Sequence, residues 1–189
     1  MGGVMYSKDG TTLVYYPQGK EAATFTTPAG VTTIGEGAFD SNTKLTAVTL
    51  SEGVTSIGDY AFDGCDSLTS ITIPASVTSI GDGAFSCNGL KTVILPSTLT
   101  YIGNNSFYNC TGLEEISIPS SVESIGDYAF YGCNQLASIE LPNGVTQLGD
   151  NAFCQCSSLT EFTFPPKVTE ISDGLFSQCS GFTTFDIPD

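Results

Sequence analysis

Cysteine is the residue type in this sequence with the clearest chemical potential, because thiolates bind metals and thiols form disulfides. Six of the seven cysteines recur at one position of a repeated pattern: Cys65, Cys87, Cys110, Cys133, Cys156 and Cys179. Stacked repeats would place their Cα atoms about 5 Å apart, which permits a disulfide, but parallel Cβ vectors generally miss the required dihedral angle. We therefore interpret these cysteines as small buried thiols that fill a core, with disulfides or metal binding as the alternative.

The usual zinc-binding pattern is missing from the sequence. Histidine is absent, and the only C-x-C pair, Cys154 and Cys156, has no second pair to complete four ligands. Cys154 lies off the repeated position, and we expect it to be partly exposed. We predict neither a bound metal nor a cofactor.

A second repeated position is mostly acidic. Its members are Glu36, Asp59, Asp82, Asn104, Asp127, Asp150 and Asp173. We expect each side chain to accept hydrogen bonds from backbone N–H groups of its own turn. Calcium bridging adjacent repeats is the alternative, since hard oxygen ligands suit that ion, but the G-G-x-G-x-D pattern of calcium-binding β-rolls is absent.

Four tyrosines occupy turn positions of two adjacent repeats. They are Tyr101, Tyr108, Tyr128 and Tyr131. Aromatic rings with a polar tip suit contacts with proteins or glycans, so these residues are candidates for a binding rim. The alternative is a ladder of tyrosine rings that stack on one another.

The repeat that must position all these residues has a period of 23 residues. The phenylalanines Phe39, Phe62, Phe85, Phe107, Phe130, Phe153 and Phe176 follow it, with a single step of 22 after Phe85. One unit reads L-x-x-[IVF]-x-[ILF]-P-x-x-[VL]-x-x-[IL]-G-[DN]-x-[AS]-F-x-x-C-x-x. A fixed period of this length predicts a solenoid, in which each coil buries its apolar edges against its neighbours.

Each unit divides into a strand and a return segment. The stretch S-I-T-I-P (70–74) alternates polar and apolar residues and predicts a short strand in a parallel sheet, spaced about 4.8 Å per coil. For V-T-S-I-G-D-G-A-F (77–85) we expect an irregular turn with one helical or 3₁₀ turn rather than a second long strand. Gly81 would permit positive φ there.

The chain begins with a different pattern. Residues 4–16 place two Val- and Tyr-rich runs around K-D-G, which predicts a β-hairpin. We interpret residues 1–21 as an N-terminal β-hairpin cap. Residues 22–189 then form the repeat array, with a degenerate first coil, six full repeats and a truncated last repeat.

The outward-facing strand positions change character along the array. The first four coils present mainly Ser and Thr, whereas the last four alternate acids with hydroxyls. The candidate binding residues on this face are Glu115, Ser117, Ser138, Glu140, Glu161, Thr163 and Asp186. Such a face is either a solvated, solubilising surface or a recognition surface for a basic or cation-bridged partner.

The balance of acidic and basic residues excludes several classes of function. Twenty acidic residues oppose five lysines, and the net charge is −15. A phosphate-backbone ligand needs clustered Lys and Arg, so nucleic acid and anionic membranes are excluded as partners. No apolar run is long enough for direct membrane insertion. Without His or Arg most triads and phosphate clamps are impossible, and we expect no enzyme.

The combination of I-x-I-P, I-G-D-x-A-F and F-x-x-C-x-x-L over residues 22–189 resembles the BspA-like leucine-rich repeat family of cell-surface and secreted proteins. The resemblance implies a right-handed arc with its parallel β-sheet on the concave face. It also implies an extracellular or cell-surface adhesion module whose partner is a host or matrix protein, or a glycan, with the signal or anchor outside this chain. A non-binding structural spacer of a larger surface protein is the alternative, and the sequence leaves the oligomeric state open.

Overall fold

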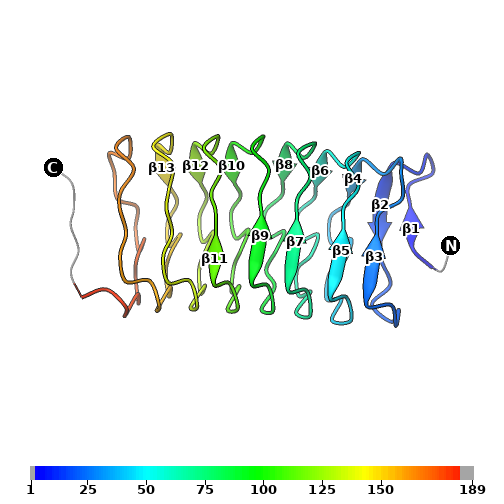
Figure 1. The fold of residues 1–189 in the computed structure, drawn as a ribbon, viewed down its shortest axis with the longest axis horizontal. Coiled ribbons are helices and arrows are strands. Elements are labelled where there is room, and N and C mark those ends of the chain that lie inside the picture. The colour runs from blue at the N-terminus through cyan, green and yellow to red at the C-terminus, as the bar shows by residue number, and fades with distance from the viewer. Residues whose placement is uncertain (1–2, 184–189) are drawn as a thin grey trace.

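The chain folds into a stack of similar coils, which the computed structural model describes for residues 3–183 (Figure 1). One parallel sheet, the first sheet, is built from the strand half of successive coils. Its strands are β3 (Thr24–Thr26), β5 (Ala47–Thr49), β7 (Ser70–Thr72), β9 (Thr92–Ile94) and β11 (Glu115–Ile116). The predicted solenoid of coils of about 23 residues with parallel strands is confirmed.

The register of the first sheet follows the repeat. Equivalent residues of successive strands lie opposite one another. The pairs are Thr24–Ala47, Ala47–Ser70, Ser70–Thr92 and Thr92–Glu115. The central residue of each strand points inward, as Val48, Ile71 and Val93 are at least 94% buried. The residues flanking them face outward, as the alternation predicts.

The return half of the coils contains a second row of strands that the sequence interpretation missed. It forms an N-terminal return sheet with β4 (Thr33–Ile34), β6 (Ser56–Ile57) and β8 (Ser79–Ile80). A C-terminal return sheet follows, with β10 (Tyr101–Ile102), β12 (Ser124–Ile125) and β13 (Gln147–Leu148). The strands are only two residues long, and the part of the chain described has no helical turn in these segments. The expected helical or 3₁₀ turn is therefore wrong. Most return backbone groups bond to a neighbouring coil, as the Thr78 N–H does to the Thr55 carbonyl at 3.0 Å, and bonds within a segment, such as Ser106 N–H to the Gly103 carbonyl at 3.3 Å, are isolated turns.

The predicted N-terminal hairpin is confirmed. Strands β1 (Met5–Tyr6) and β2 (Thr12–Tyr15) pair antiparallel, and β2 then pairs parallel with β4. The hairpin thus extends the N-terminal return sheet (Figure 1). Tyr16 is 99% buried against Phe25 and Phe39, so the cap covers the apolar end of the first coil.

The core is a column of stacked phenylalanines. From Phe39 to Phe176, successive rings lie 4.8–5.8 Å apart between centroids and within 13° of parallel. The stack runs unbroken through the one coil of 22 residues, between Phe85 and Phe107. Because every ring covers the next, each coil depends on its neighbours to keep water from its core.

Gly81 is required for a reason other than the predicted positive φ. A Cβ atom at Gly81 would lie 2.2 Å from the Asp59 Oδ1 atom and 2.4 Å from the Asp59 backbone nitrogen. The positive φ angles occur two residues later in the coil, at Tyr60 (54°), Gly83 (65°) and Tyr128 (55°). The repeated glycine therefore permits close approach of two coils, and the left-handed turn lies beyond it.

Candidate functional site

The first sheet places most of the candidate binding residues on one continuous face. Glu115 is exposed on β11, beside the buried Ile116. Ser117 is exposed just after it in the same coil, and the equivalent segments of the next two coils expose Ser138, Glu140, Glu161 and Thr163. Asp186 lies outside the described residues. The structure thus brings six of the seven candidates together.

Two adjoining hollows open on this face between successive coils. The first, of about 360 Å³, is lined by Glu115, Ser117, Ser138 and Glu140. The second, of about 400 Å³, shares Ser138 and Glu140 and adds Glu161 and Thr163. Their floors are apolar and include Ile116, Ile139, Leu141 and Phe162.

The hollows begin where the backbone ladder of the first sheet ends. Strand β11 is the edge of that sheet, and no backbone hydrogen bond joins the described segments 115–118 and 138–141. The C-terminal return sheet remains paired through β13, where Ser124 lies opposite Gln147. The coils of Glu115 and Glu140 are therefore joined on the return side and open on the first-sheet side, whereas the coils of Glu140 and Glu161 keep one bond there, from the Thr160 N–H to the Ala137 carbonyl at 3.4 Å.

The carboxylates of this face have no cationic partner within residues 3–183. Lys91 forms an ion pair with Glu114 at 3.2 Å, and Lys44 pairs with Glu21 at 2.5 Å. Neither lysine pairs with Glu115, Glu140 or Glu161, and Lys167 lines neither hollow. The face therefore presents unneutralised negative charge.

Three of the four candidate tyrosines contact one another through their rings, and Tyr101 lies outside this group. Tyr108 and Tyr131 stack at 4.8 Å between centroids, with Tyr128 tilted against Tyr131 at 5.9 Å. The Tyr131 hydroxyl accepts a hydrogen bond from the Gln155 Nε2 group at 2.6 Å. Tyr101 lies apart on β10, and its hydroxyl donates to the Asn104 Oδ1 atom at 3.2 Å. Burial, together with the negative charges of Asp82 and Asp127, raises the pKa of Tyr101.

A third hollow crosses the C-terminal return sheet and was missed by the sequence interpretation. It has a volume of about 570 Å³, and its lining includes Tyr101, Asn104, Asp127, Gln147, Asp150 and Glu170. The outward positions of β10, β12 and β13 supply part of this lining. The signal in the sequence is the [VL]-x-x-[IL]-G spacing of the return segments, which recurs in each coil that contains one of these short strands.

The acidic column bonds between coils rather than within a turn, which corrects the predicted partner. The Oδ1 atom of Asp59 accepts the backbone N–H of Asp82, and that of Asp82 accepts the N–H of Asn104. The pattern continues through Asp127, Asp150 and Asp173 at 2.8–3.1 Å. From Asp59 to Asp150, each side chain of the column therefore joins its coil to the next one.

All seven cysteines are free thiols and buried. In the repeated column each Sγ atom donates a hydrogen bond to the phenylalanine carbonyl of the preceding coil, at 2.8–3.2 Å. Burial raises the pKa of Cys110 to about 12 and that of Cys179 to about 11. Cys154 is 96% buried beside this column, so the expectation of partial exposure is wrong. Within residues 3–183 no three potential metal-ligating side chains gather.

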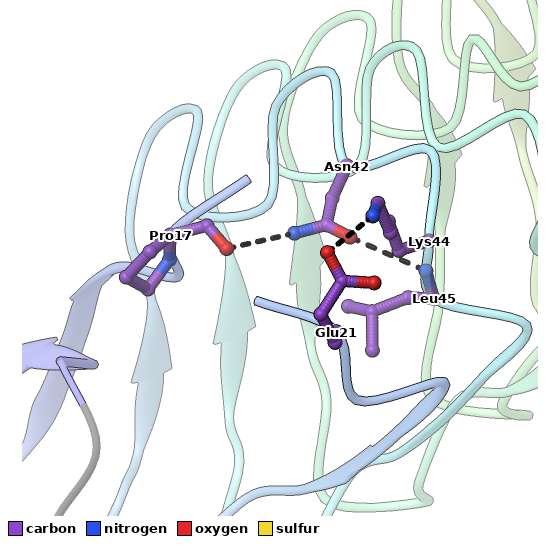
Figure 2. A network of polar contacts seen from close by, with 5 residues as sticks. All are labelled: Pro17, Glu21, Asn42, Lys44 and Leu45. Atoms are coloured by element: carbon purple, nitrogen blue, oxygen red, sulfur yellow. Dashed lines mark hydrogen bonds and ion pairs between the residues drawn. The ribbon is translucent and has the colours of Figure 1, made fainter. Parts of the chain in front are cut away.

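Asn42 replaces the cysteine in the first coil, and its amide bonds to the chain on both sides (Figure 2). Its Nδ2 group donates to the Pro17 carbonyl at 3.5 Å, and its Oδ1 atom accepts the Leu45 N–H at 3.2 Å. Beside it, Lys44 and Glu21 form their ion pair. The longer polar side chain thus connects the first coil to the cap.

Within residues 3–183, no helix has the length and hydrophobicity needed to cross a membrane.

Comparison with protein families gives one match. A family profile described as a BspA type leucine-rich repeat region matches six copies, over residues 15–134 and 100–189. A search of curated protein sequences gave no significant match.

Solved structures of bacterial leucine-rich repeat proteins are similar to this chain. One from Eubacterium ventriosum is 31% identical with a TM-score of 0.87, and the match covers 98% of this chain and 50% of that one. A second, from Bacteroides ovatus, is 27% identical with a TM-score of 0.74, covering 96% of this chain and 61% of that one. A leucine-rich cell surface protein from Faecalibacterium prausnitzii is 30% identical with a TM-score of 0.59, covering 89% and 48%. The chain thus spans half the length of the first of these relatives.

Proposed function

Because this chain belongs to the BspA-type leucine-rich repeat family, we propose that it is a binding module that recognises a protein or glycan partner through its first-sheet face. Leucine-rich repeat solenoids are typically binding scaffolds without enzymatic activity, and they generally bind proteins. The match to the Eubacterium ventriosum structure covers 98% of this chain and 50% of that one.

The observation that carries the proposal is the pair of adjoining hollows on the first sheet. They expose Glu115, Glu140 and Glu161 without a lysine partner, over an apolar floor. A spacer that binds nothing has no need for an opened coil surface of this kind. Concavity with convergent polar groups is the usual form of a binding site.

We place this activity outside the cell or on its surface. Support comes from the similarity to a protein described as a leucine-rich cell surface protein. The burial of all seven thiols is compatible with an oxidising exterior, because a buried protonated thiol reacts slowly.

The tyrosine rim is the proposed second contact area. Tyr108, Tyr128 and Tyr131 offer aromatic edges, and Tyr101 stands at the third hollow. Tyr128 is 38% exposed and Tyr101 is 40% exposed, so a partner could contact both rings.

A binding panel of extracellular matrix proteins and glycans tests the proposal, with a triple variant Glu115→Lys, Glu140→Lys, Glu161→Lys. The matched control reverses three exposed acids outside both hollows, Glu36→Lys, Glu52→Lys and Glu123→Lys. Circular dichroism and thermal melting verify that both variants fold.

We expect a panel member to bind the native chain and the control variant but not the first variant. Binding that survives in the first variant and is lost in Tyr128→Ala would move the site to the rim. If no panel member binds, the proposal fails and the protein acts as a spacer.

A further inference from the structure

Resting on the proposed function, we infer that the first-sheet face takes an extended, cationic segment of a protein partner, with lysine or arginine side chains in the two hollows. The hollows lie side by side because both are lined by Ser138 and Glu140. A single partner segment can therefore occupy both.

The polar groups that line the hollows favour a hydrogen-bond donor with positive charge. Glu115, Glu140 and Glu161 carry carboxylates, which only accept hydrogen bonds. Ser117, Ser138 and Thr163 add hydroxyls that accept as well as donate. A guanidinium or ammonium group satisfies several acceptors at once, and charge-assisted bonds of this type are the stronger ones.

The opened backbone adds further acceptors. Since no backbone hydrogen bond joins segments 115–118 and 138–141, their carbonyl groups between the two coils are not used by the sheet ladder. In the N-terminal half the same groups are paired, for example between β5 and β3. The opened region is therefore richer in available acceptors than the rest of the sheet.

The apolar floor suits the stems of long basic side chains. Ile116 and Ile139 are more than 90% buried beneath the carboxylates, and Leu141 and Phe162 pack against the core beside them. Lys and Arg place their methylene stems on such surfaces while the charged group reaches polar partners. A short anion or an acidic peptide would meet only repulsion here.

An extended partner segment that crosses both hollows would present alternate side chains to this face. Side chains at positions i and i+2 of a strand lie about 6.6–6.8 Å apart. Hydrogen-bonded coils are about 4.8 Å apart, and no backbone hydrogen bond joins segments 115–118 and 138–141 across the first hollow. We therefore expect a partner with basic residues at every second position.

The negative charge of the whole chain supports the same partner class. A net charge of −15 attracts a cationic segment over a distance set by the ionic strength. The attraction becomes specific only at the hollows, because the sheet face of the first four coils carries no acid at its outward positions.

The test uses a labelled peptide in which arginine and serine alternate, measured by fluorescence anisotropy at low and high ionic strength. A peptide of identical composition with consecutive arginines probes the spacing, and one with glutamate in place of arginine probes the charge. Two triple variants of equal net charge are compared. The first carries Glu115→Gln, Glu140→Gln and Glu161→Gln on the first-sheet face. The second, the control, carries Glu36→Gln, Glu52→Gln and Glu123→Gln.

We expect the alternating peptide to bind, with the first variant weakening affinity at least about tenfold and the second less than about twofold. High ionic strength should weaken binding, and the consecutive-arginine peptide should bind less tightly. Equal losses in both variants would mean that only net charge attracts the peptide, and the inference would be wrong. If a neutral glycan or a non-basic protein binds in a Glu115-dependent manner while the peptide does not, the proposed function stands and this inference fails.

Discussion

The stacked thiols show how one residue type is stabilised by repetition. Each Sγ atom donates to a carbonyl of the preceding coil, so burial leaves no thiol hydrogen in the column without an acceptor. Ionisation would place a thiolate beside that carbonyl oxygen in a dry core. Burial therefore raises the pKa of Cys110 to about 12.

These thiols should resist modification until the protein unfolds. At about pH 8 we expect a disulfide reagent such as dithiobis(nitrobenzoate) to react with almost none of the seven cysteines in the native protein and with all seven in denaturant. Cys179, with 9% exposure and a pKa of about 11, should react before Cys110 as the pH rises. Mass spectrometry after timed labelling identifies the order, and rapid reaction of Cys110 in the native state would contradict it.

The same shifts predict that stability falls in alkali. An unfolded thiol ionises near pH 9, whereas the folded thiols of Cys110 and Cys179 keep their protons to higher pH. The folded state then binds more protons than the unfolded state, so the free energy of unfolding decreases as pH rises above about 9. Urea unfolding between pH 7 and about pH 10 measures this, and a flat profile would contradict it.

At the scale of the element, coils are joined by side chains that reach the next backbone. The Asp127 Oδ1 atom accepts the Asp150 N–H at 2.8 Å, and Asn104 does the same for Asp127. An amide oxygen thus already replaces a carboxylate at one step of the column. The acceptor oxygen, rather than the charge, is therefore the feature that the contact repeats from coil to coil.

Two variants of Asp127 separate these contributions. Asp127→Asn retains an Oδ1 acceptor and removes one negative charge, so we expect a change of less than about 0.5 kcal/mol in the free energy of unfolding. Asp127→Ala leaves the Asp150 N–H without its acceptor and should cost about 1 kcal/mol. Urea unfolding compares the two, and equal losses would show that charge is the important term.

At the scale of the whole molecule, charge opposes compactness. Twenty acidic side chains and five lysines share a surface in which, among the described residues, few ion pairs form. Their mutual repulsion destabilises the folded chain, and salt screens it over about 10 Å at 0.1 M.

We therefore expect sodium chloride to raise the melting temperature. In a chain of this size about 1 kcal/mol corresponds to about 2–4 °C, so a rise of several degrees between low salt and about 0.5 M is the expected size. The Glu115→Lys, Glu140→Lys, Glu161→Lys variant, which is less negative, should depend less on salt. A melting temperature that falls with salt would show that attractive pairs outweigh repulsion.

The repeat, the solenoid, the N-terminal hairpin and the first-sheet register can all be predicted from the amino-acid sequence. These follow from local periodicity, because a residue such as Ile71 faces inward in every coil that keeps the pattern. For the same reason the sequence grouped Glu115, Glu140 and Glu161 on one face. Their role in binding stays a prediction.

The contacts between atoms of neighbouring coils cannot be predicted in this way and become visible in the folded structure. Gly81 is needed because Asp59 of the preceding coil lies against it, and Asp82 accepts a bond from the coil that follows. Cys154 is buried by its neighbours, and the hollows at Glu140 exist because two coils are not hydrogen-bonded there. Such contacts depend on the distance between coils, and the spacing of residues within one coil does not determine that distance.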